Sequence, residues 1–360
     1  PLPFIMPTLF FLLLYPFSVI YGGLMQLRNK CYDWNLFKTT RFKLPIISVG
    51  NLSLGGTGKT PHTEYIIRLL QDEFNTAILS RGYKRKTKGF YLADSQTSVL
   101  EIGDEPLQYH LKFKKTTVAV SEKRVDGVVQ ILKQAPKTDV IILDDAFQHR
   151  PIAPGCNILI TAQNNLYVDD TVFPSGRLRE WKTGSERADI IIVSKTSPDL
   201  TALEKAEIQA QLRPKAHQKL FFSYVKYGNI VPLTKAAQHF NVIENSDTSL
   251  LLLTGIANPQ PLLDFLNPQY SSVQHLQFKD HHNYSVDDTQ QIMQQFDAIV
   301  SENKLIISTE KDAMRLSLPH VIETLQHLPI FYIPIEICFH GDDKKEFDRQ
   351  LLEYVKKTSI

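Results

Sequence analysis

The stretch "SVGNLSLGGTGKTPHTEY", residues 48–65, predicts how the chain around it folds. Its Gly58-Lys59-Thr60 ends a phosphate-binding loop of the pattern G-x-x-x-x-G-K-S/T, in which Ser53 stands at the position of the first glycine. In such a loop, backbone N–H groups and a helix N-terminus point at phosphate oxygens. A serine costs little at position 53 if the backbone there does not need a left-handed angle.

The neighbouring segments support a functional loop. "PIISVGN" at 45–51 has the pattern of a buried strand, and "TPHTEYIIRLL" at 60–70 that of a helix, with Pro61 in the first turn where proline is tolerated. Glycines leave the backbone free to approach phosphate. The residues expected to bind the nucleotide are Gly55, Gly56, Thr57, Gly58, Lys59 and Thr60.

A nucleotide site of this kind also needs an acidic residue at the end of another buried strand. "VIILDDAFQHR" at 140–150 provides Asp144 and Asp145 there. We expect Lys59 to neutralise the transferring phosphoryl group, and Thr60 and the two aspartates to bind Mg²⁺. A GTPase would show N/T-K-x-D after a late strand, whereas "SKTSPD" at 194–199 has a serine in place of that aspartate, so ATP is the expected nucleotide.

Short runs rich in Val and Ile alternate with amphipathic stretches, a pattern typical of a parallel sheet covered by helices. The strands expected in the first domain lie at 45–51, 76–82, 117–121, 139–145, 157–162 and 189–195. Two further strand-like runs around Tyr227-Gly228-Asn229 predict a hairpin connector, and a second strand, turn and helix series begins at about residue 247.

The predicted fold class is therefore α/β, with a P-loop NTPase-type parallel-sheet domain of about six strands and a smaller second α/β domain. A β-hairpin linker joins the two, and a membrane-associated helix precedes them. The expected segments are an apolar N-terminal segment (1–30), a P-loop kinase domain (31–219), a hairpin linker (220–246) and a C-terminal α/β domain (247–360).

The N-terminal segment differs from the rest of the chain. Residues 2–25 include no charged side chain and are long enough in principle to cross a bilayer core of ~30 Å, although Pro3, Pro7 and Pro16 interrupt them. Basic residues follow closely, so we expect a membrane-seated helix or helical pair with its basic flank on the cytoplasmic side. A cleaved signal peptide and a buried core helix are the alternatives; no charged region precedes the apolar run as a signal peptide requires.

The composition narrows the class of protein. The chain has 360 residues, 43% of them hydrophobic, which argues against disorder and allows two packed domains. A net charge of +2 is too mild to indicate nucleic acid as the main partner. Three widely spaced cysteines form neither a disulfide framework nor a zinc motif and fit a reducing compartment.

Phosphoryl transfer to an alcohol also needs a carboxylate or histidine that takes the hydroxyl proton. Several polar clusters contain such residues, and none of them is diagnostic alone. A Gly-Asp-Glu-Pro is most often a solvated turn, and an Arg-Leu-Arg-Glu run is most often a helix face with local ion pairs. The clusters are "SRGYKRK" (80–86), "GDEP" (103–106), "SEKRVDG" (121–127), "FPSGRLREW" (173–181) and "FKDHHNYS" (278–285).

Taken in order along the chain, these blocks resemble the tetraacyldisaccharide 4'-kinase family, the membrane-bound kinases of lipid A biosynthesis in Gram-negative bacteria. The resemblance also includes "YGGLMQLRNKCYD", "LTGIANP" and "STEKDAM", covers nearly the whole chain, and includes Ser or Thr at position 53. Two departures stand out. Ala146 follows the paired aspartates where the family often has glycine, and Arg177 and Trp181 stand where many members have other residues.

The resemblance implies transfer of the ATP γ-phosphate to the 4'-hydroxyl of an acylated glucosamine disaccharide 1-phosphate, forming lipid IVA. It implies that Asp104 is the catalytic base and that His281 assists it. It implies that the enzyme acts at the bilayer surface on the cytoplasmic face of the bacterial inner membrane. It implies neither a nucleic-acid partner nor an obligatory protein partner. The other residues that it implies in the metal, phosphate and acceptor shells are Glu105, Asp144, Asp145, Gln148, His149, Arg179 and Glu180.

Two other classes of protein stay open as alternatives. A P-loop regulatory GTPase would share the loop and the "LDD" but would give the apolar N-terminus no purpose. A membrane-associated nucleotide-binding adaptor would bind ATP and membranes yet be indifferent to the substitution Asp104→Ala.

Overall fold

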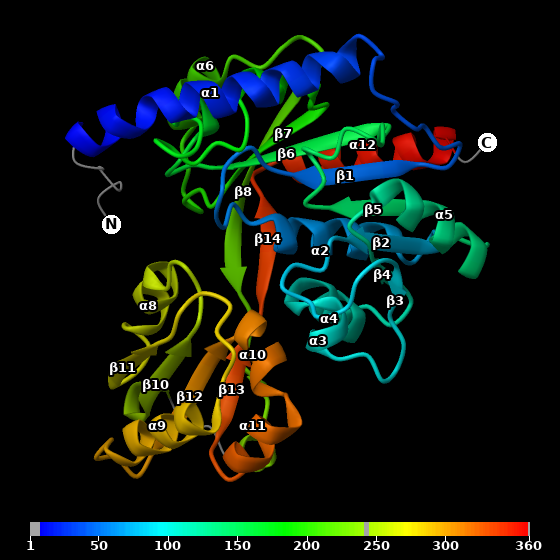
Figure 1. The fold of residues 1–360 in the computed structure, drawn as a ribbon. Helices are drawn as coiled ribbons and strands as arrows, with labels where there is room; N and C mark the ends of the chain where they lie inside the picture. Colours follow the sequence, from blue (N-terminus) through cyan, green and yellow to red (C-terminus); the bar gives the residue numbers. More distant parts are fainter. Residues whose placement is uncertain (1–7, 241–244, 359–360) are drawn as a thin grey trace. The chain divides into compact units, whose positions relative to one another are not determined.

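The computed structural model describes residues 8–240 and 245–358, which fall into two compact units (Figure 1). Unit 1 comprises the described residues of 1–102, 109–225 and 337–360, and unit 2 those of 103–108 and 226–336. The first seven residues of the expected apolar segment and residues 241–244 of the expected linker lie outside the described residues.

The sheet of unit 1 confirms the six strands expected from the sequence and adds three more. Its order is β14-β8-β7-β6-β1-β5-β2-β4-β3, and the six expected strands pair in parallel. The bounds are β1 (Ile46–Gly50), β2 (Thr76–Ser80), β3 (Tyr91–Leu92), β4 (Thr117–Val120), β5 (Val140–Asp144), β6 (Cys156–Ala162), β7 (Ile190–Ser194), β8 (Lys219–Tyr227) and β14 (Ile335–Phe339).

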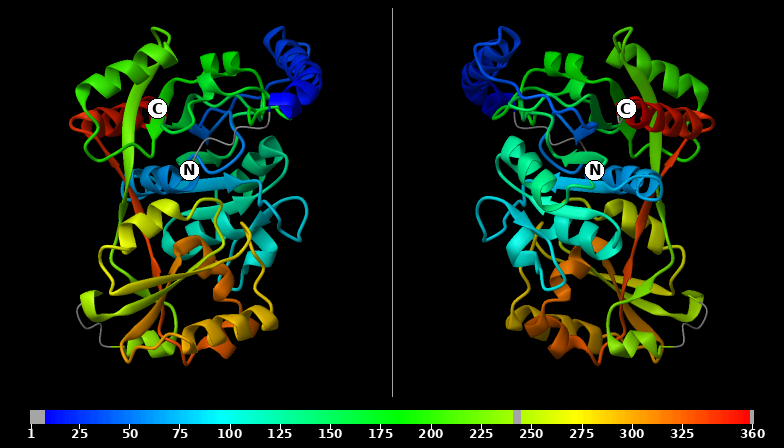
Figure 2. Two further views of the ribbon diagram at one scale, coloured as in Figure 1. Left: turned by 90° about the vertical axis from the view of Figure 1, so that its left-hand side faces the viewer. Right: turned by 90° about the vertical axis from the view of Figure 1, so that its right-hand side faces the viewer.

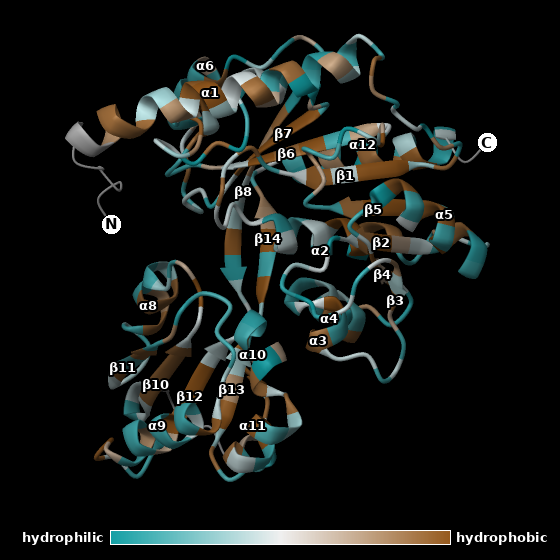
Figure 3. Ribbon diagram, in the orientation of Figure 1, coloured by the Kyte–Doolittle hydropathy of each residue, from teal (hydrophilic) through white to brown (hydrophobic). Residues whose placement is uncertain are grey.

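Both faces of this sheet are covered, because its strands are apolar on both sides (Figure 3). On β1, Ile47 packs with α2 (Lys59–Leu70) and α12 (Asp343–Thr358), whereas Ile46 packs with α5 (Arg124–Gln134). The second face continues over β6 and β7, where α6 (Ala202–Leu212) packs. In Figure 2, α12 (red) and α1 (dark blue) lie on opposite sides of this unit.

Two sequence expectations about the connection are corrected. The runs around Tyr227-Gly228-Asn229 do not form one hairpin, since β8 lies between β7 and β14 while β9 (Val231–Pro232) pairs with β13 in the other sheet. Phe221 and Phe222 of β8 join the cores on the two faces of unit 1, which explains its pairing there. Residues 337–360, expected in the C-terminal domain, belong to unit 1 because α12 buries an apolar stripe on its sheet.

Unit 2 contains a five-stranded sheet of order β11-β10-β12-β13-β9, in which only β9 is antiparallel. Alternate residues of β10 pack into two cores, one with α9 and α11 and the other with α7 and α8. The bounds are β10 (Ser249–Thr254), β11 (Ser272–Gln277), β12 (Lys304–Thr309), β13 (Ile330–Ile333), α7 (Lys235–Gln238), α8 (Gln260–Leu266), α9 (Val286–Asp297), α10 (Glu310–Leu316) and α11 (Pro319–Leu325).

Helix α1 (Thr8–Asp33) is one helix over its described length and contains Pro16. No helix in the described part of the chain is long and apolar enough to cross a bilayer. The face of α1 that packs on unit 1 is small and polar: Ser18 is buried, and a Cβ on Gly22 would come within 2.6 Å of the Trp181 ring. Apolar residues at helical spacing are exposed on α1, among them Leu13, Phe17, Ile20, Leu24 and Leu27, while Gln26 and Lys30 are exposed near its C-terminal end.

Candidate active site

The phosphate-binding loop connects β1 to α2 as expected. Gly55 and Gly58 have φ angles of 105° and 87°, which a side chain would strain. Ser53 does not have a positive φ angle. It is buried and forms a β-bridge with Leu178. The serine is therefore tolerated because this position is not left-handed.

The segment that carries Arg179 is fixed to this loop by backbone hydrogen bonds. The N–H of Leu54 donates to the carbonyl of Arg177 over 2.7 Å, and the N–H of Arg179 donates to the carbonyl of Leu52 over 2.7 Å. Inside the loop, Asn51 Nδ2 donates to Thr57 Oγ1 over 2.9 Å. The "GRLRE" motif thus lies beside the loop.

Two residues at the end of β7 also donate hydrogen bonds to the loop, and neither was predicted as a site residue from the sequence. Ser194 Oγ donates to the carbonyl of Thr57 over 2.7 Å, and Lys195 Nζ donates to the carbonyl of Gly56 over 2.6 Å. The signal in the sequence was a Ser-Lys at the carboxyl end of a predicted parallel strand, where ligand-binding side chains gather.

Asp145 connects the loop lysine to Arg179. Arg179 Nη1 and Nη2 donate to Asp145 Oδ1 and Oδ2 over 2.9 and 3.2 Å, and Lys59 Nζ lies 3.7 Å from Oδ1. Burial alone would raise the pKa of Asp145, but the charges of Lys59 and Arg179 outweigh it and hold that pKa below its usual value. Asp145 has a φ of 45°, so its carboxylate follows a sharp turn of the chain.

Asp144 lies in the sheet beside the loop strand. Its Cα pairs with that of Val49, it is 1% exposed, and its Oδ2 accepts from Ser80 Oγ over 3.1 Å. Buried Arg124, also missed from the sequence, donates to the carbonyl of Asp144 over 3.1 Å. Burial lowers the pKa of Arg124 to about 10 even though Asp144 and Asp145 oppose this.

Gln148 and Glu180 form a buried network beside the loop. Gln148 Nε2 donates to the carbonyl of Asn51 over 2.9 Å and to Glu180 Oε1 over 3.1 Å, and its Oε1 accepts from Arg179 Nη1 over 3.4 Å. Arg187 Nη2 donates to Glu180 Oε1 over 2.7 Å. Three of the expected residues, Gln148, Arg179 and Glu180, are therefore brought together around the phosphate-binding loop.

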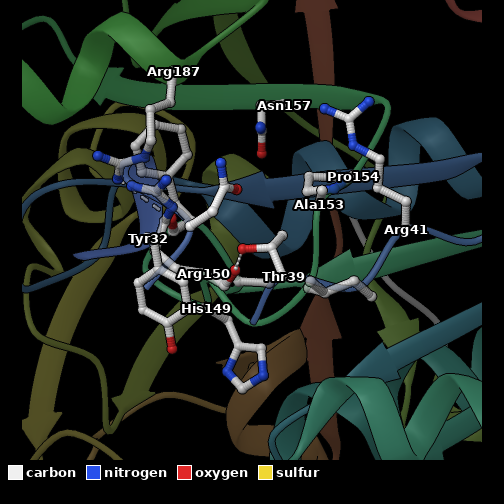
Figure 4. A pocket seen from close by; sticks show the side chains of 13 residues that line it. Tyr32, Thr39, Arg41, His149, Arg150, Ala153, Pro154, Asn157 and Arg187 are labelled. Carbon is white, nitrogen blue, oxygen red and sulfur yellow. Dashed lines mark hydrogen bonds between the residues drawn. The ribbon is translucent and has the colours of Figure 1, made fainter. Parts of the chain in front are cut away.

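His149 faces a neighbouring pocket of unit 1 with a volume of about 550 Å³ (Figure 4). Its Nε2 accepts from the N–H of Arg124 over 3.3 Å, and burial, then the charge of Arg124, lowers its pKa to about 4, so the ring is neutral at pH 7. Arg41, Arg150 and Arg187 also line the pocket, and no carboxylate does within the described residues. Arg187 and Arg150 are paired with Glu180 and Asp33, and Lys59 is not part of the pocket lining.

Residues 103–108, expected in the P-loop domain at 31–219, belong instead to unit 2, and there Asp104 contacts His281. His281 Nδ1 lies 2.7 Å from Asp104 Oδ2, and Arg315, which sequence reasoning missed, places Nε 2.7 Å from Oδ1 and Nη2 2.9 Å from Oδ2. Burial opposes ionisation, but hydrogen bonds from His281 and Arg315 hold the pKa of Asp104 below its usual value. Asp104 therefore accepts protons readily only from a strongly polarised donor.

The loop that carries His281 is fixed to β10. The N–H of His281 donates to the carbonyl of Gly255 over 3.1 Å, and a Cβ on Gly255 would come within 2.8 Å of Asp312 Oδ1, so "LTGIANP" needs its glycine. Lys311 Nζ lies 3.1 Å from His281 Nε2. The second histidine has a structural role, since His282 binds Asp288 near the start of α9.

The structure thus forms two groups of expected residues, one in each unit. Glu105 follows Asp104 in the first turn of α4 (Asp104–Lys112) and belongs to unit 2. Among the residues that the structure describes, no three His, Cys, Asp or Glu side chains are grouped so that they could hold a metal ion.

This fold and loop define an α/β nucleotide-binding protein of the P-loop class. A family model described as Tetraacyldisaccharide-1-P 4'-kinase matches residues 10–356, and the chain belongs to that family. The tetraacyldisaccharide 4'-kinase of Phocaeicola vulgatus is 43% identical over 349 residues, covering 96% of this chain and 95% of that protein. That of Parabacteroides distasonis is 44% identical over 351 residues, covering 95% and 94%.

A solved structure shows the same fold. The crystal structure of LpxK from Aquifex aeolicus in complex with ATP superposes with a TM-score of 0.72 at 26% identity, covering 96% of this chain and 99% of that one.

Proposed function

We propose that this chain is an ATP-dependent lipid kinase, which transfers the γ-phosphate of ATP to the 4'-hydroxyl of tetraacyldisaccharide 1-phosphate and forms lipid IVA in lipid A biosynthesis. Family membership over residues 10–356 carries the proposal. The contacts of Lys59 with Asp145, and of Asp104 with His281, support it, because they join residues that the family resemblance selects.

In this proposal unit 1 holds ATP. The loop N–H groups and the N-terminus of α2 bind the phosphates, and Lys59 neutralises the charge on the transferring group. Asp145, which is itself paired with Arg179, holds Lys59 in place through an ion pair. The related Aquifex aeolicus protein was crystallised with ATP, which supports ATP rather than GTP.

The donor set suits Mg²⁺ that arrives with the nucleotide. Mg²⁺ is usually bound by one or two carboxylates, waters and substrate phosphates, so it needs no cage of three carboxylates. Thr60 and Asp144 would hold it, because Asp144 ends the strand next to β1 and Asp145 is already engaged by Lys59 and Arg179. The ion would supply positive charge that neutralises the phosphates of the nucleotide.

On the acceptor side, the 4'-oxygen forms a bond to the γ-phosphorus as the bond to the β,γ-bridging oxygen breaks, and ADP leaves. The hydroxyl proton goes to Asp104, which His281 and Arg315 orient. Asp104 has a low pKa, so it is ionised at neutral pH and takes the proton only as the hydroxyl oxygen bonds to phosphorus and its proton becomes acidic.

The exposed apolar stripe of α1 would lie in the headgroup region of a bilayer, where an acceptor with four acyl chains resides. Exposed large apolar side chains are unusual for a helix on a globular unit, and here the helix packs inward through Ser18, Tyr21 and Gly22 instead. We place the chain at the cytoplasmic face of the bacterial inner membrane, where ATP is available.

The test incubates the protein with γ-labelled ATP, Mg²⁺ and purified tetraacyldisaccharide 1-phosphate in detergent micelles. The proposal expects a labelled lipid from the wild type and none from Asp104→Ala. Preference for GTP would favour a regulatory GTPase. ATP binding without any labelled lipid would favour a nucleotide-binding adaptor.

A further inference from the structure

Helix α1 reaches the nucleotide site through one polar side chain. Asn29 Nδ2 donates to Glu180 Oε2 over 2.6 Å, and Glu180 is 2% exposed. The same carboxylate accepts from Gln148 and Arg187 through its other oxygen. Asn29 therefore contacts a buried carboxylate that is part of the network around the phosphate-binding loop.

From Glu180 the contacts continue to the loop by two routes. Gln148 Nε2 donates to the carbonyl of Asn51, the residue that follows β1. Gln148 Oε1 accepts from Arg179, which pairs with Asp145 and so with Lys59. A displacement of Glu180 would therefore change the position of Gln148 and, through it, of the charges that hold Lys59.

The position of α1 against this network is fixed by close packing. Gly22 lets the helix approach the Trp181 ring, and Tyr21 Oη donates to the carbonyl of Arg179 over 3.1 Å. Arg28 donates to the carbonyl of Gln148 over 3.4 Å. Gly184 lies beside the same oxygen that Asn29 contacts, since a Cβ on Gly184 would come within 2.8 Å of Glu180 Oε2.

We propose that Asn29 is a positioning residue for phosphoryl transfer, through which α1 sets the geometry of Glu180, Gln148 and the Lys59 ion pairs. The inference rests on the proposed kinase function and deepens it. The helix with the exposed apolar face is then part of the catalytic apparatus and not only an attachment to the membrane.

The test compares Asn29→Ala with Gln26→Ala, which removes an exposed amide one turn earlier on the same helix. We expect Asn29→Ala to lower kcat about tenfold, the effect of one hydrogen bond to a charged group, with the KM for the lipid acceptor within about twofold of wild type. Gln26→Ala should leave both unchanged. An Asn29→Ala enzyme with wild-type kcat would overturn the proposal.

A second variant separates positioning from folding. Asn29→Asp keeps the shape of the side chain but places a carboxylate against Glu180, so we expect a larger loss of kcat at pH 8 that is partly relieved at lower pH, where the two groups share a proton. A pH profile parallel to that of the wild type would contradict the proposal.

Nucleotide affinity, measured without lipid, distinguishes this inference from the kinase function itself. Asn29→Ala should bind ATP more weakly than wild type and Gln26→Ala, whichever acceptor the protein uses. Absence of lipid phosphorylation by the wild type would refute the kinase proposal alone, while either wild-type turnover or wild-type ATP affinity in Asn29→Ala would refute the role of Asn29.

Discussion

The carboxylate of Asp104 lies 2.7 Å from Nδ1 of His281 and is also paired with Arg315. All three residues belong to unit 2. The arrangement orients the histidine and keeps the carboxylate ionised, which are the conditions that a base for an alcohol proton needs at neutral pH.

Replacing Arg315 with Gln should move the acidic limb of the kcat–pH profile to higher pH. Arg315 lowers the pKa of Asp104, so its removal raises that pKa, and activity is then lost earlier as the pH falls. The exposed Arg349→Gln on α12 is the control and should leave the limb in place. An unmoved limb in Arg315→Gln would mean that Asp104 is not the titrating group.

Removing the loop lysine should abolish catalysis with little effect on folding. Lys59 is largely buried, and its charge faces the phosphate-binding loop and Asp145. We expect Lys59→Ala to lower kcat by at least about 10²-fold, as for loss of a preorganised charge in other active sites. Circular dichroism should show an intact fold, and turnover within about threefold of wild type would exclude the proposed role.

The Thr60 hydroxyl should control the Mg²⁺ requirement. Thr60→Ala removes an oxygen ligand, so half-maximal activity should need about tenfold more Mg²⁺, whereas Thr60→Ser keeps the ligand and should resemble wild type. A Mg²⁺ titration of turnover at saturating ATP measures this. Identical Mg²⁺ curves for the Ala and Ser variants would remove Thr60 from the metal site.

His62 should make the protein less stable in mild acid. Its Nδ1 lies 2.7 Å from the carbonyl of Gly58, and burial lowers its pKa from 6.5 to about 4. As the pH falls below 6.5 the unfolded chain therefore takes up a proton that the folded ring does not, and the free energy of unfolding decreases.

Between pH 7 and pH 5 this residue should reduce the unfolding free energy by about 2 kcal/mol. Urea unfolding of the wild type and of His62→Gln at both pH values measures the difference. His149 has a similarly lowered pKa and adds the same trend to both proteins, so only the difference between them is informative. Equal pH dependence in the two proteins would show that His62 titrates normally.

The apolar stripe of α1 should bind bilayers. Phe17→Asp combined with Leu24→Asp places charges on residues that are 61% and 63% exposed, so folding should be little affected while co-sedimentation with phosphatidylglycerol and phosphatidylethanolamine vesicles is lost. Leu203→Asp on α6 changes an equally exposed leucine elsewhere in unit 1 and serves as the control. Retained vesicle binding in the double variant would contradict a role for this face.

The sequence predicted the elements of the fold better than their connections. The strands of unit 1 were predictable because short Val- and Ile-rich runs are typical of parallel strands that are buried on both faces. The predicted hairpin at residues 227–229 was wrong, because the strand before it and the strand after it pair with different sheets. The assignment of α12 to a domain was also wrong, because an amphipathic pattern predicts a helix with one buried face but not the sheet on which that face packs.

In the candidate site, too, residues placed by local sequence were predicted and residues placed by long-range contacts were not. Lys59, Asp144 and Asp145 could be predicted because the loop and the strand end fix their places locally. Arg315, Arg124 and Lys195 were missed because their roles come from contacts between segments far apart in sequence, such as Arg315 with Asp104 and Arg124 with Asp144. Asn29 lay in a segment that was interpreted from its apolar character as membrane-associated, so its contact with Glu180 was not predicted.

The most direct measurement locates the phosphate that the enzyme transfers. After reaction with γ-labelled ATP, the lipid product is isolated and the labelled position is assigned by mass spectrometry and ³¹P NMR. The account predicts one new phosphate on the 4'-oxygen of the disaccharide from wild type and none from Asp104→Ala. Label only in inorganic phosphate, label at another position, or equal product from Asp104→Ala would contradict it.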